Sequence, residues 1–377
     1  MIAVEALPAT MRAAVMYAVD DIRIEEVPVP KLQPGDALLR MAACGVCGSD
    51  MMPWYVKKKA PFVFGHEPAG TIVALGEGAD DAAHFSLGAR VFPHHHAPCL
   101  RCADCDAGRY VHCATWRATF LDPGGMAEYV RVPRENLADT LLLPDSLSFA
   151  DGSLVEPLAC VVKSLRRAFP LELRAGVVPV TKTGDLPLRG RTLYVIGAGV
   201  TGLMHVALAR SLGATIVASD FNQERLQLAR RLGASATCAP EAALETIRAA
   251  TRGGSADAVI CGPSSPEALA GAIEAVRNDG TVIMFTPIDP AKRIALDQSP
   301  LYFRDLRLVA SYSCGPDDTR ESLRAIERGI VSAARLRVTE FPFPDVAEAF
   351  AQMQHADVVK AVVTFPEPRG IEPSPAL

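Results

Sequence analysis

The stretch from Thr192 to Asp220, TLYVIGAGVTGLMHVALARSLGATIVASD, decides the fold of this chain. It begins with an apolar run at 192–196, passes through the glycine-rich turn GAGVTG, and enters a segment of helical period at 200–212. A second apolar run follows at 215–219. Short continuous apolar runs joined by a helix are typical of parallel strands buried on both faces. The stretch therefore predicts a strand–helix–strand unit of a parallel sheet.

The turn after the first strand has the spacing Gly197-x-Gly199-x-x-Gly202. Between a strand and a helix, the first glycine permits the tight turn, the second lets the backbone approach a pyrophosphate, and the third lets the helix pack on the strand. The helix opens at Val200 and Thr201, where unpaired N–H groups favour an anion. The turn therefore predicts a dinucleotide-binding site.

Asp220 ends the second strand of this unit. A carboxylate at this position can accept both hydroxyls of a ribose and repels a 2′-phosphate, which favours NAD over NADP. Arg225, five residues further on, is the opposing signal, because an arginine there can bind a 2′-phosphate. Its alternative interpretation is a solvated helix residue, which the presence of Asp220 favours.

The alternation of strands and helices continues after this unit. Gly213 and Gly233 follow the first two expected helices, where glycine can adopt the left-handed conformation that caps a helix. Six strands in all would make a doubly wound sheet. The further elements expected are helices at 224–232, 267–276 and 319–328 and strands at 256–260, 281–285 and 307–311.

The sequence from Met11 to about Glu156 has a different texture, with short β-rich runs broken by Gly and Pro. Strands are expected there at 71–75, 89–92 and 128–132, and β-type runs return at 336–343 and 359–365. The sequence therefore predicts a β-rich domain at 1–165, an α/β domain at 166–318 that begins with a connection at 166–189, and a return to the first domain at 319–377.

Composition excludes several classes of protein. The 377 residues are 49% hydrophobic and 21% charged, which suits packed cores rather than disorder. A formal net charge of −5 gives no basic excess to neutralise a nucleic acid backbone. No apolar run approaches the roughly 20 residues of a membrane span, and the N-terminus lacks the basic start of a signal peptide. We expect a soluble cytoplasmic protein with neither nucleic acid nor membrane as partner.

The chain has ten cysteines, and four of them are clustered. Their spacing, C-x₂-C-x₂-C-x₇-C, within residues 99–113 can close a tetrahedral shell of four thiolates around zinc, which would order the loop without catalysing a reaction. The alternatives are unrelated buried thiols, a redox pair or an iron–sulfur cluster, for which the fourth ligand is seldom so close. The residues expected to bind this structural zinc are Cys99, Cys102, Cys105 and Cys113.

Further segments carry metal-ligand types: CGVCGSD at 44–50, GHEPAG at 65–70 and EPLAC at 156–160. In this order, with the cysteine cluster, PGGMAEYVRVP and the glycine-rich turn, they resemble the zinc-dependent medium-chain dehydrogenases of the alcohol and polyol dehydrogenase superfamily. The resemblance runs from Met11 to about Pro366. EPLAC and the HHHAPC before the cluster resemble the sorbitol/iditol and threonine dehydrogenase branch. The resemblance to the medium-chain dehydrogenases implies a GroES-like catalytic domain joined to a Rossmann domain.

The resemblance implies that Cys47 and His66 are ligands of a catalytic zinc. Glu67 would be a ligand or an exchange partner, and Glu156 would supply the remaining ligand directly or through water. One thiolate, one imidazole and one carboxylate leave a fourth position open, as catalytic zinc requires. Asp50 would accept a hydrogen bond from His66 and fix its tautomer.

Ser49 would receive the proton of a secondary alcohol while hydride passes to the nicotinamide of NAD. Many relatives carry a histidine two residues after the aspartate, where this chain has Met52, so the end of the proton relay is open. The polyol branch has an arginine before a pocket tyrosine, where this chain has Ser311 and Tyr312. This difference argues against a sorbitol-like substrate. The resemblance implies a secondary alcohol of polyol, sugar or amino-alcohol type and does not identify it further.

The remaining cysteines are interpreted as packed thiols, and most of the run His94, His95 and His96 as structural. The alternative functions are a non-catalytic relative that binds NAD and zinc, and an NADP-dependent alcohol dehydrogenase or carbonyl reductase. Zinc-free quinone reductases lack both cysteine sites, and a zinc-ribbon nucleic acid binder conflicts with the acidic charge. Relatives are usually dimers or tetramers, so a homo-oligomer is expected.

Overall fold

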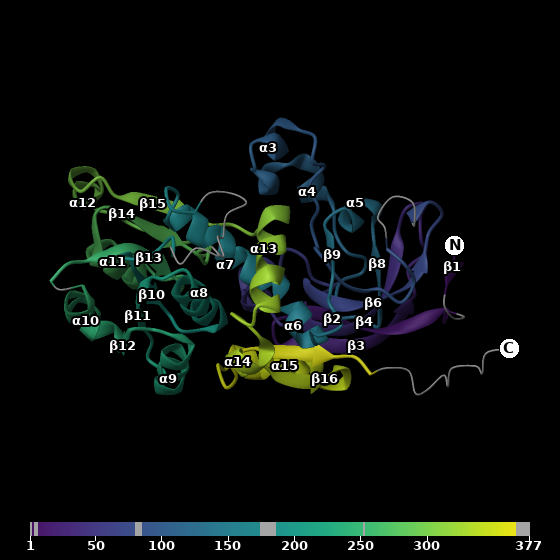
Figure 1. Cartoon of the computed structure of the whole chain (residues 1–377). Helices are drawn as coiled ribbons and strands as arrows, with labels where there is room; N and C mark the ends of the chain where they lie inside the picture. Colours follow the sequence, from purple (N-terminus) through teal and green to yellow (C-terminus); the bar gives the residue numbers. More distant parts are fainter. Residues whose placement is uncertain (1, 4–6, 80–84, 174–185, 252, 367–377) are drawn as a thin grey trace. The chain divides into compact units, whose positions relative to one another are not determined.

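The computed structural model describes residues 2–3, 7–79, 85–173, 186–251 and 253–366 (Figure 1). The chain divides into two compact units. The first comprises Met1–Ala97, Thr115–Leu154 and Val338–Leu377, and the second comprises Pro98–Ala114 and Val155–Arg337. Half of the connection expected at 166–189, namely 174–185, lies outside the described residues.

The first unit is built on a mainly antiparallel sheet centred on β4 (Ala37–Gly45) and β6 (Glu67–Leu75), in which β16 and β17 pair in parallel. The path of strands runs β16-β17-β4-β6-β7-β9, with β1 added to β6 and β8 to β4. A second sheet has the order β3-β2-β5. The other strands are β1 (Ile2–Ala3), β2 (Thr10–Ala18), β3 (Asp21–Pro28), β5 (Phe62–Val63), β7 (Arg90–Pro93), β8 (Tyr129–Val132), β9 (Thr140–Leu142), β16 (Thr339–Pro342) and β17 (Ala361–Thr364).

One apolar core joins the two sheets of this unit, with Phe64, Met126, Phe343 and Phe350 among its buried residues. Short helices fill the connections between strands. They are η1 (Gly48–Met51), α1 (Pro53–Val56), α4 (Ala114–Ala118), α5 (Arg134–Leu137), α6 (Phe149–Ser153), η4 (Phe343–Asp345) and α15 (Val346–Gln354). The return of the C-terminal segment to the β-rich unit, expected from its sequence texture, is seen in β17, which pairs with β4.

The second unit contains a parallel sheet of six strands in the order β12-β11-β10-β13-β14-β15. The quoted stretch forms β10, α8 and β11, and β10 is buried along its whole length. The strand for which the sequence named no range is β12, whose three residues are too short to show a pattern. The strands are β10 (Thr192–Ile196), β11 (Thr215–Ser219), β12 (Ala236–Cys238), β13 (Ala256–Cys261), β14 (Val276–Met284) and β15 (Arg307–Ala310).

Helices complete this doubly wound unit. They are α3 (Ala103–Asp106), η2 (Tyr110–His112), α7 (Val155–Ala168), α8 (Val200–Ser211), α9 (Gln223–Leu232), η3 (Pro240–Ala242), α10 (Ala243–Ala250), α11 (Pro266–Ala275), α12 (Gln298–Phe303), α13 (Pro316–Glu327) and α14 (Ala333–Leu336). Gly213 and Gly233 both have positive φ, as expected of left-handed caps. The predicted fold class, a β-rich GroES-like domain with a Rossmann domain, is confirmed.

Several boundaries differ from the sequence prediction, and the structure shows the cause for α13 and β16. Helix α13 begins at Pro316 rather than 319, because proline is well suited to the first helical turn and Asp318 accepts from the N–H of Gly315. The strand expected at 336–343 begins only at 339. Ser332 caps α14 instead, and Arg337 ends it in the left-handed conformation.

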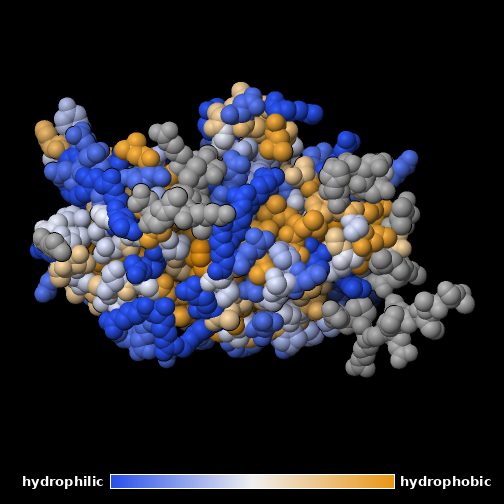
Figure 2. Space-filling model, viewed as in Figure 1, coloured by the Kyte–Doolittle hydropathy of each residue, from blue (hydrophilic) through white to orange (hydrophobic). Residues whose placement is uncertain are grey.

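Hydrophilic residues cover the visible sides of α9 and α13 (Figure 2). The opposite sides of these helices are buried, as amphipathic helices on a core require. Within the described part of the chain, no helix has both the length and the apolar composition needed to cross a membrane.

Candidate functional site

The glycine-rich turn has the geometry that a pyrophosphate needs. Gly197 has φ +89°, a conformation that favours glycine, and a Cβ at Gly202 would overlap the carbonyl oxygen of Gly197. A Cβ at Gly199 would meet no atom within 4 Å, so the space beside the turn is open. Val200 and Thr201 form the first turn of α8, with N–H groups that can bind an anion. The residues present therefore fit a dinucleotide.

Asp220 follows β11, and its carboxylate is held by the turn. The N–H of Ala198 donates to Oδ2 at 2.7 Å, and the N–H of Asn222 donates to Oδ1 at 2.8 Å. Each oxygen keeps a lone pair, so the carboxylate can still accept ribose hydroxyls. Arg225 lies in the first turn of α9, half-buried. Asp220 thus directly follows β11, and Arg225 lies five residues further on, in the next helix.

The four clustered cysteines come together in space. Their sulfurs lie within 4.8 Å of one another, with Cys102 and Cys105 at 3.5 Å and Cys99 and Cys105 at 4.0 Å. Sulfurs of a tetrahedral zinc site with bonds of about 2.3 Å are about 3.8 Å apart. Burial and neighbouring thiols raise the pKa of Cys105 well above its usual value. A cation is therefore needed for all four thiolates, including Cys113, to coexist.

The lobe that carries these cysteines is anchored to α13 within the second unit. Tyr110 donates a hydrogen bond from Oη to Asp317 at 2.9 Å, and a Cβ at Gly315 would overlap the Tyr110 ring. Burial, followed by the hydrogen bond to Asp317, raises the pKa of Tyr110 to about 12, so the phenol stays protonated as the donor. These contacts fix the lobe against the start of α13.

A second donor set lies in the first unit. The ligand atoms of Cys47, His66 and Glu67 are within 4.8 Å of one another. Cys47 precedes η1, and His66 and Glu67 stand at the start of β6. Oε1 of Glu67 is buried and has no hydrogen-bond partner among the described residues. A thiolate, an imidazole and an unsatisfied carboxylate oxygen fit Zn²⁺ with a position left for substrate.

Two residues that the sequence named lie beside this donor set. Oδ1 of Asp50 is 3.7 Å from Nδ1 of His66, and Asp50 is only 3% exposed. Burial raises the pKa of Asp50, and the nearby imidazole opposes that shift. Ser49 donates from Oγ to the sulfur of Cys47 at 3.4 Å. Asp50 is thus placed to orient His66, and Ser49 lies next to the metal ligand.

Glu67 has a partner that the sequence analysis missed. Lys360, which directly precedes β17, forms an ion pair with Oε2 of Glu67, and each side chain is 1% exposed. Its Nζ also donates to the carbonyl of Val46 at 2.8 Å. The sequence did contain a signal for this ion pair, since Lys360 directly precedes the apolar run of β17. A lysine that is buried with such a strand needs a negatively charged partner.

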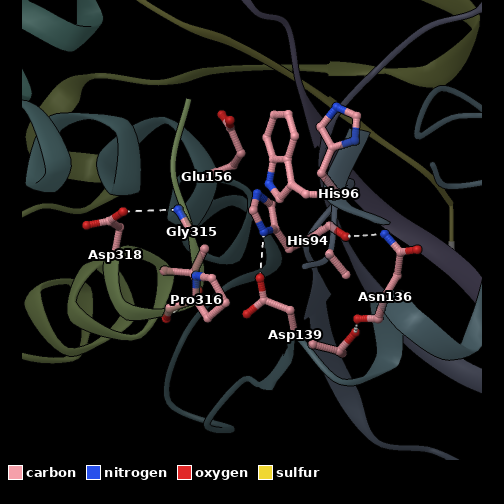
Figure 3. A network of polar contacts seen from close by, with 12 residues as sticks. His94, His96, Asn136, Asp139, Glu156, Gly315, Pro316 and Asp318 are labelled. Atoms are coloured by element: carbon pink, nitrogen blue, oxygen red, sulfur yellow. Dashed lines mark hydrogen bonds and ion pairs between the residues drawn. The ribbon is translucent and has the colours of Figure 1, made fainter. Parts of the chain in front are cut away.

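The three consecutive histidines follow β7 and have different surroundings, and Figure 3 shows His94 bonded to Asp139. His94 is bonded through Nδ1 to Asp139 at 2.7 Å, and Nδ1 of His96 lies 2.7 Å from the carbonyl of Thr119. These contacts agree with a structural interpretation of both residues. His95 instead lies against His66, with ring centroids 5.1 Å apart. Burial, and then the neighbouring histidines, lower the pKa of His95 well below its usual value, so the ring is neutral.

Glu156 belongs to the second unit, where it stands in the first turn of α7 and is 5% exposed. Its carboxylate lies with two thiols that the sequence analysis had treated only as packed. Cys160 is 3.5 Å from Oε1, and the ligand atoms of Glu156, Cys160 and Cys314 are all within 4.8 Å of one another. The i, i+4 spacing of Glu156 and Cys160 was visible in the sequence, but the approach of Cys314 was not.

Comparisons with known proteins identify the family of the chain. The model of the alcohol dehydrogenase GroES-like domain matches residues 33–145, and that of the zinc-binding dehydrogenases matches 200–328. Sorbitol dehydrogenase of Bacillus subtilis (strain 168) is 32% identical over 73% of this chain and 74% of its own. L-Threonine 3-dehydrogenase of Symbiobacterium thermophilum is 32% identical over 69% of this chain and 70% of its own.

Solved structures give the same result. The structure of 2R,3R-butanediol dehydrogenase from Bacillus subtilis is 26% identical, with a TM-score of 0.77 over 95% of this chain and all of that one. Both family models fall on the two units that hold the donor sets and the glycine-rich turn. The chain therefore belongs to the zinc-binding, medium-chain alcohol dehydrogenase family, whose members use a nicotinamide cofactor.

Proposed function

We propose that this enzyme oxidises a secondary alcohol of polyol, sugar or amino-alcohol type with NAD, and reduces the corresponding ketone with NADH. The observation that carries the proposal is the donor set of Cys47, His66 and Glu67, in which Oε1 of Glu67 is buried and unsatisfied. The glycine-rich turn with Asp220 supports the cofactor. Relatives named for sorbitol, threonine and butanediol support the substrate class.

Cys47 and His66 are the proposed ligands of the catalytic zinc, with a carboxylate from Glu67 or Glu156 as the third. When bound, zinc supplies a Lewis acid that lowers the pKa of an alcohol, and the nicotinamide accepts hydride. The ion pair with Lys360 holds one oxygen of Glu67, which leaves Oε1 as the oxygen that can reach the metal. Glu156 remains the alternative ligand that the family resemblance implies.

The protein's own groups handle the proton. Oxidation breaks the C–H bond of the carbinol carbon, whose electron pair leaves with hydride, and the hydroxyl proton must leave as well. Ser49, whose Oγ lies 3.4 Å from the sulfur of Cys47, is proposed to accept that proton and pass it to water. Asp50, whose Oδ1 lies 3.7 Å from Nδ1 of His66, is proposed to accept a hydrogen bond from that nitrogen, which would direct the other nitrogen of the ring to the metal. Met52 cannot continue the relay.

Two zinc ions per chain are proposed, one catalytic and one held by the four-cysteine lobe. Closed thiolate shells stabilise structure, whereas mixed sets with an open position support chemistry. The family resemblance also supports assembly as a homodimer or homotetramer.

The test is a panel of secondary alcohols offered with NAD⁺ and NADP⁺. We expect NADH formation with at least one polyol, vicinal diol or amino alcohol, its loss after dialysis against a strong chelator, and recovery on adding Zn²⁺. Absence of turnover with every alcohol and both nucleotides would reject the proposed function. Full activity of protein shown to contain no zinc would reject the metal's role.

Asp220→Ala is expected to shift the cofactor preference towards NADP⁺. Loss of charge-assisted hydrogen bonds of about 1.5–3 kcal/mol should lower kcat/KM for NAD⁺ by about 10- to 150-fold. NADP⁺ should suffer less, because the repulsion of its 2′-phosphate is removed as well. The measurement is kcat/KM with both nucleotides, together with the Kd of NADH from fluorescence.

Asp220→Asn is the matched control for the turn. Its amide oxygen can still accept from one of the two N–H groups, that of Ala198 or that of Asn222, so it removes the charge while retaining more of the turn than alanine does. An unchanged ratio of kcat/KM for NAD⁺ over NADP⁺ in Asp220→Ala would contradict the proposal that Asp220 sets the preference for NAD. Arg225 would then be the next residue to test.

A further inference from the structure

His95 is the one member of the histidine run whose side chain is not explained by the fold. His94 is tied to Asp139, and His96 is tied to Thr119 and packed on Trp116 with ring centroids 4.1 Å apart. Nδ1 of His95 is buried and has no hydrogen-bond partner within the residues that the structure describes. An unsatisfied buried nitrogen costs about 1–3 kcal/mol, so a conventional packing role does not account for a histidine here.

The position of His95 points to the reacting centre. Its ring lies 5.1 Å from that of His66, at an interplanar angle of 51°. The donor atoms that lie within 4.8 Å of one another in this region are those of Cys47, His66 and Glu67, and His95 is not among them. His95 is therefore next to a proposed metal ligand without belonging to the ligand set, which is where a group that contacts substrate is expected.

The chemistry of the ring suits a hydroxyl group. The side chain is partly exposed, and a neutral imidazole has one N–H donor and one acceptor nitrogen. In His94 and His96 the tautomer is set by the partner of Nδ1, but no protein group among the described residues sets it in His95. The exposed edge of the ring can therefore donate to a hydroxyl or accept from it.

We propose that His95 binds a second hydroxyl of the substrate, on the carbon next to the one that is oxidised, and so selects vicinal diols and polyols over simple alcohols. The inference rests on the proposed function, because it needs the reacting hydroxyl to lie beside Cys47 and His66. A site that hydrogen-bonds a substrate hydroxyl discriminates against the analogue that lacks it, since the site's own polar group is then left unpaired. His95 is thus a specificity-determining residue.

The experiment compares butane-2,3-diol in its three stereoisomers with the enantiomers of butan-2-ol, which lack only the neighbouring hydroxyl. His95→Phe keeps a ring of similar size and removes both nitrogens. We expect it to lower the ratio of kcat/KM for the best diol over the matched mono-alcohol by about tenfold or more, mainly through KM for the diol. His95→Gln keeps a donor and an acceptor and should recover part of the ratio.

Two further measurements separate this role from a structural one. His96→Phe, at the adjacent position, should leave the ratio unchanged even if it lowers stability, and zinc content should be the same in His95→Phe as in the wild type. Equal losses for diol and mono-alcohol in His95→Phe, or a wild-type enzyme that does not prefer the diol, would overturn the proposal. A wild-type enzyme that oxidises no alcohol of the wider panel would reject the proposed function, and this role with it.

Discussion

Replacing Cys47 by serine is expected to remove one zinc ion per chain and to lower NADH formation by about 10³-fold or more. The thiolate is the only sulfur in the donor set with His66 and Glu67, and serine does not ionise near neutral pH. Lewis-acid stabilisation amounts to several kcal/mol, and each 1.36 kcal/mol of barrier is about tenfold in rate. The measurements are zinc per chain by atomic spectroscopy and kcat/KM on the best alcohol of the panel.

Two other cysteines serve as controls for this experiment. Cys238→Ser, at a partly buried thiol of β12, should change neither zinc content nor rate. Cys105→Ser should remove a different zinc, the one proposed for the lobe, and lower thermal stability. Undiminished turnover in Cys47→Ser with one zinc ion fewer per chain would show that the zinc bound by Cys47 is not catalytic. Retention of all zinc would show that Cys47 is not a ligand.

The parallel sheet could be predicted from sequence because its signal is local. The strands β10 and β11 are continuous apolar runs whose burial requires no knowledge of distant residues, and GAGVTG marks the turn between them. The position of strand β12 was not predicted, because its three partly buried residues are too few to show a hydrophobic pattern. The start of β16 was placed too early because the cap at Ser332 competes with the β-type run that follows.

The candidate site was predictable to the extent that its residues fall in short motifs. One motif contains Cys47, Ser49 and Asp50, and another contains His66 and Glu67. The spacing of residues within these motifs was therefore enough to predict metal ligands. Contacts across long sequence separations carry no such signal. The partner of Glu67 is 293 residues away, and the neighbour of Cys160 on α7 is Cys314, which comes from a loop before α13. The fold alone brings these groups together.

Replacing Lys360 by methionine is expected to destabilise the zinc-free protein by about 3–5 kcal/mol, and the zinc-bound protein by less, because the metal would partly replace the lost positive charge. Glu67 would then be left as a buried carboxylate that is 1% exposed and has lost its counter-ion, while the carbonyl of Val46 would lose its donor. Removal of one partner of a buried ion pair costs far more than the pair contributes, because the remaining charge cannot be hydrated. The measurement is denaturant unfolding in the presence and absence of a chelator.

The double variant Lys360→Met/Glu67→Gln identifies the cause. If the unpaired charge is the source of the loss, the neutral amide should restore a large part of the stability that Lys360→Met removes. Lys57→Met, at an exposed lysine that follows α1, is the matched control and should fall within about 0.5 kcal/mol of the wild type. A loss of less than about 1 kcal/mol in Lys360→Met, or a double variant as unstable as the single one, would show that the charge of Glu67 is not what Lys360 stabilises.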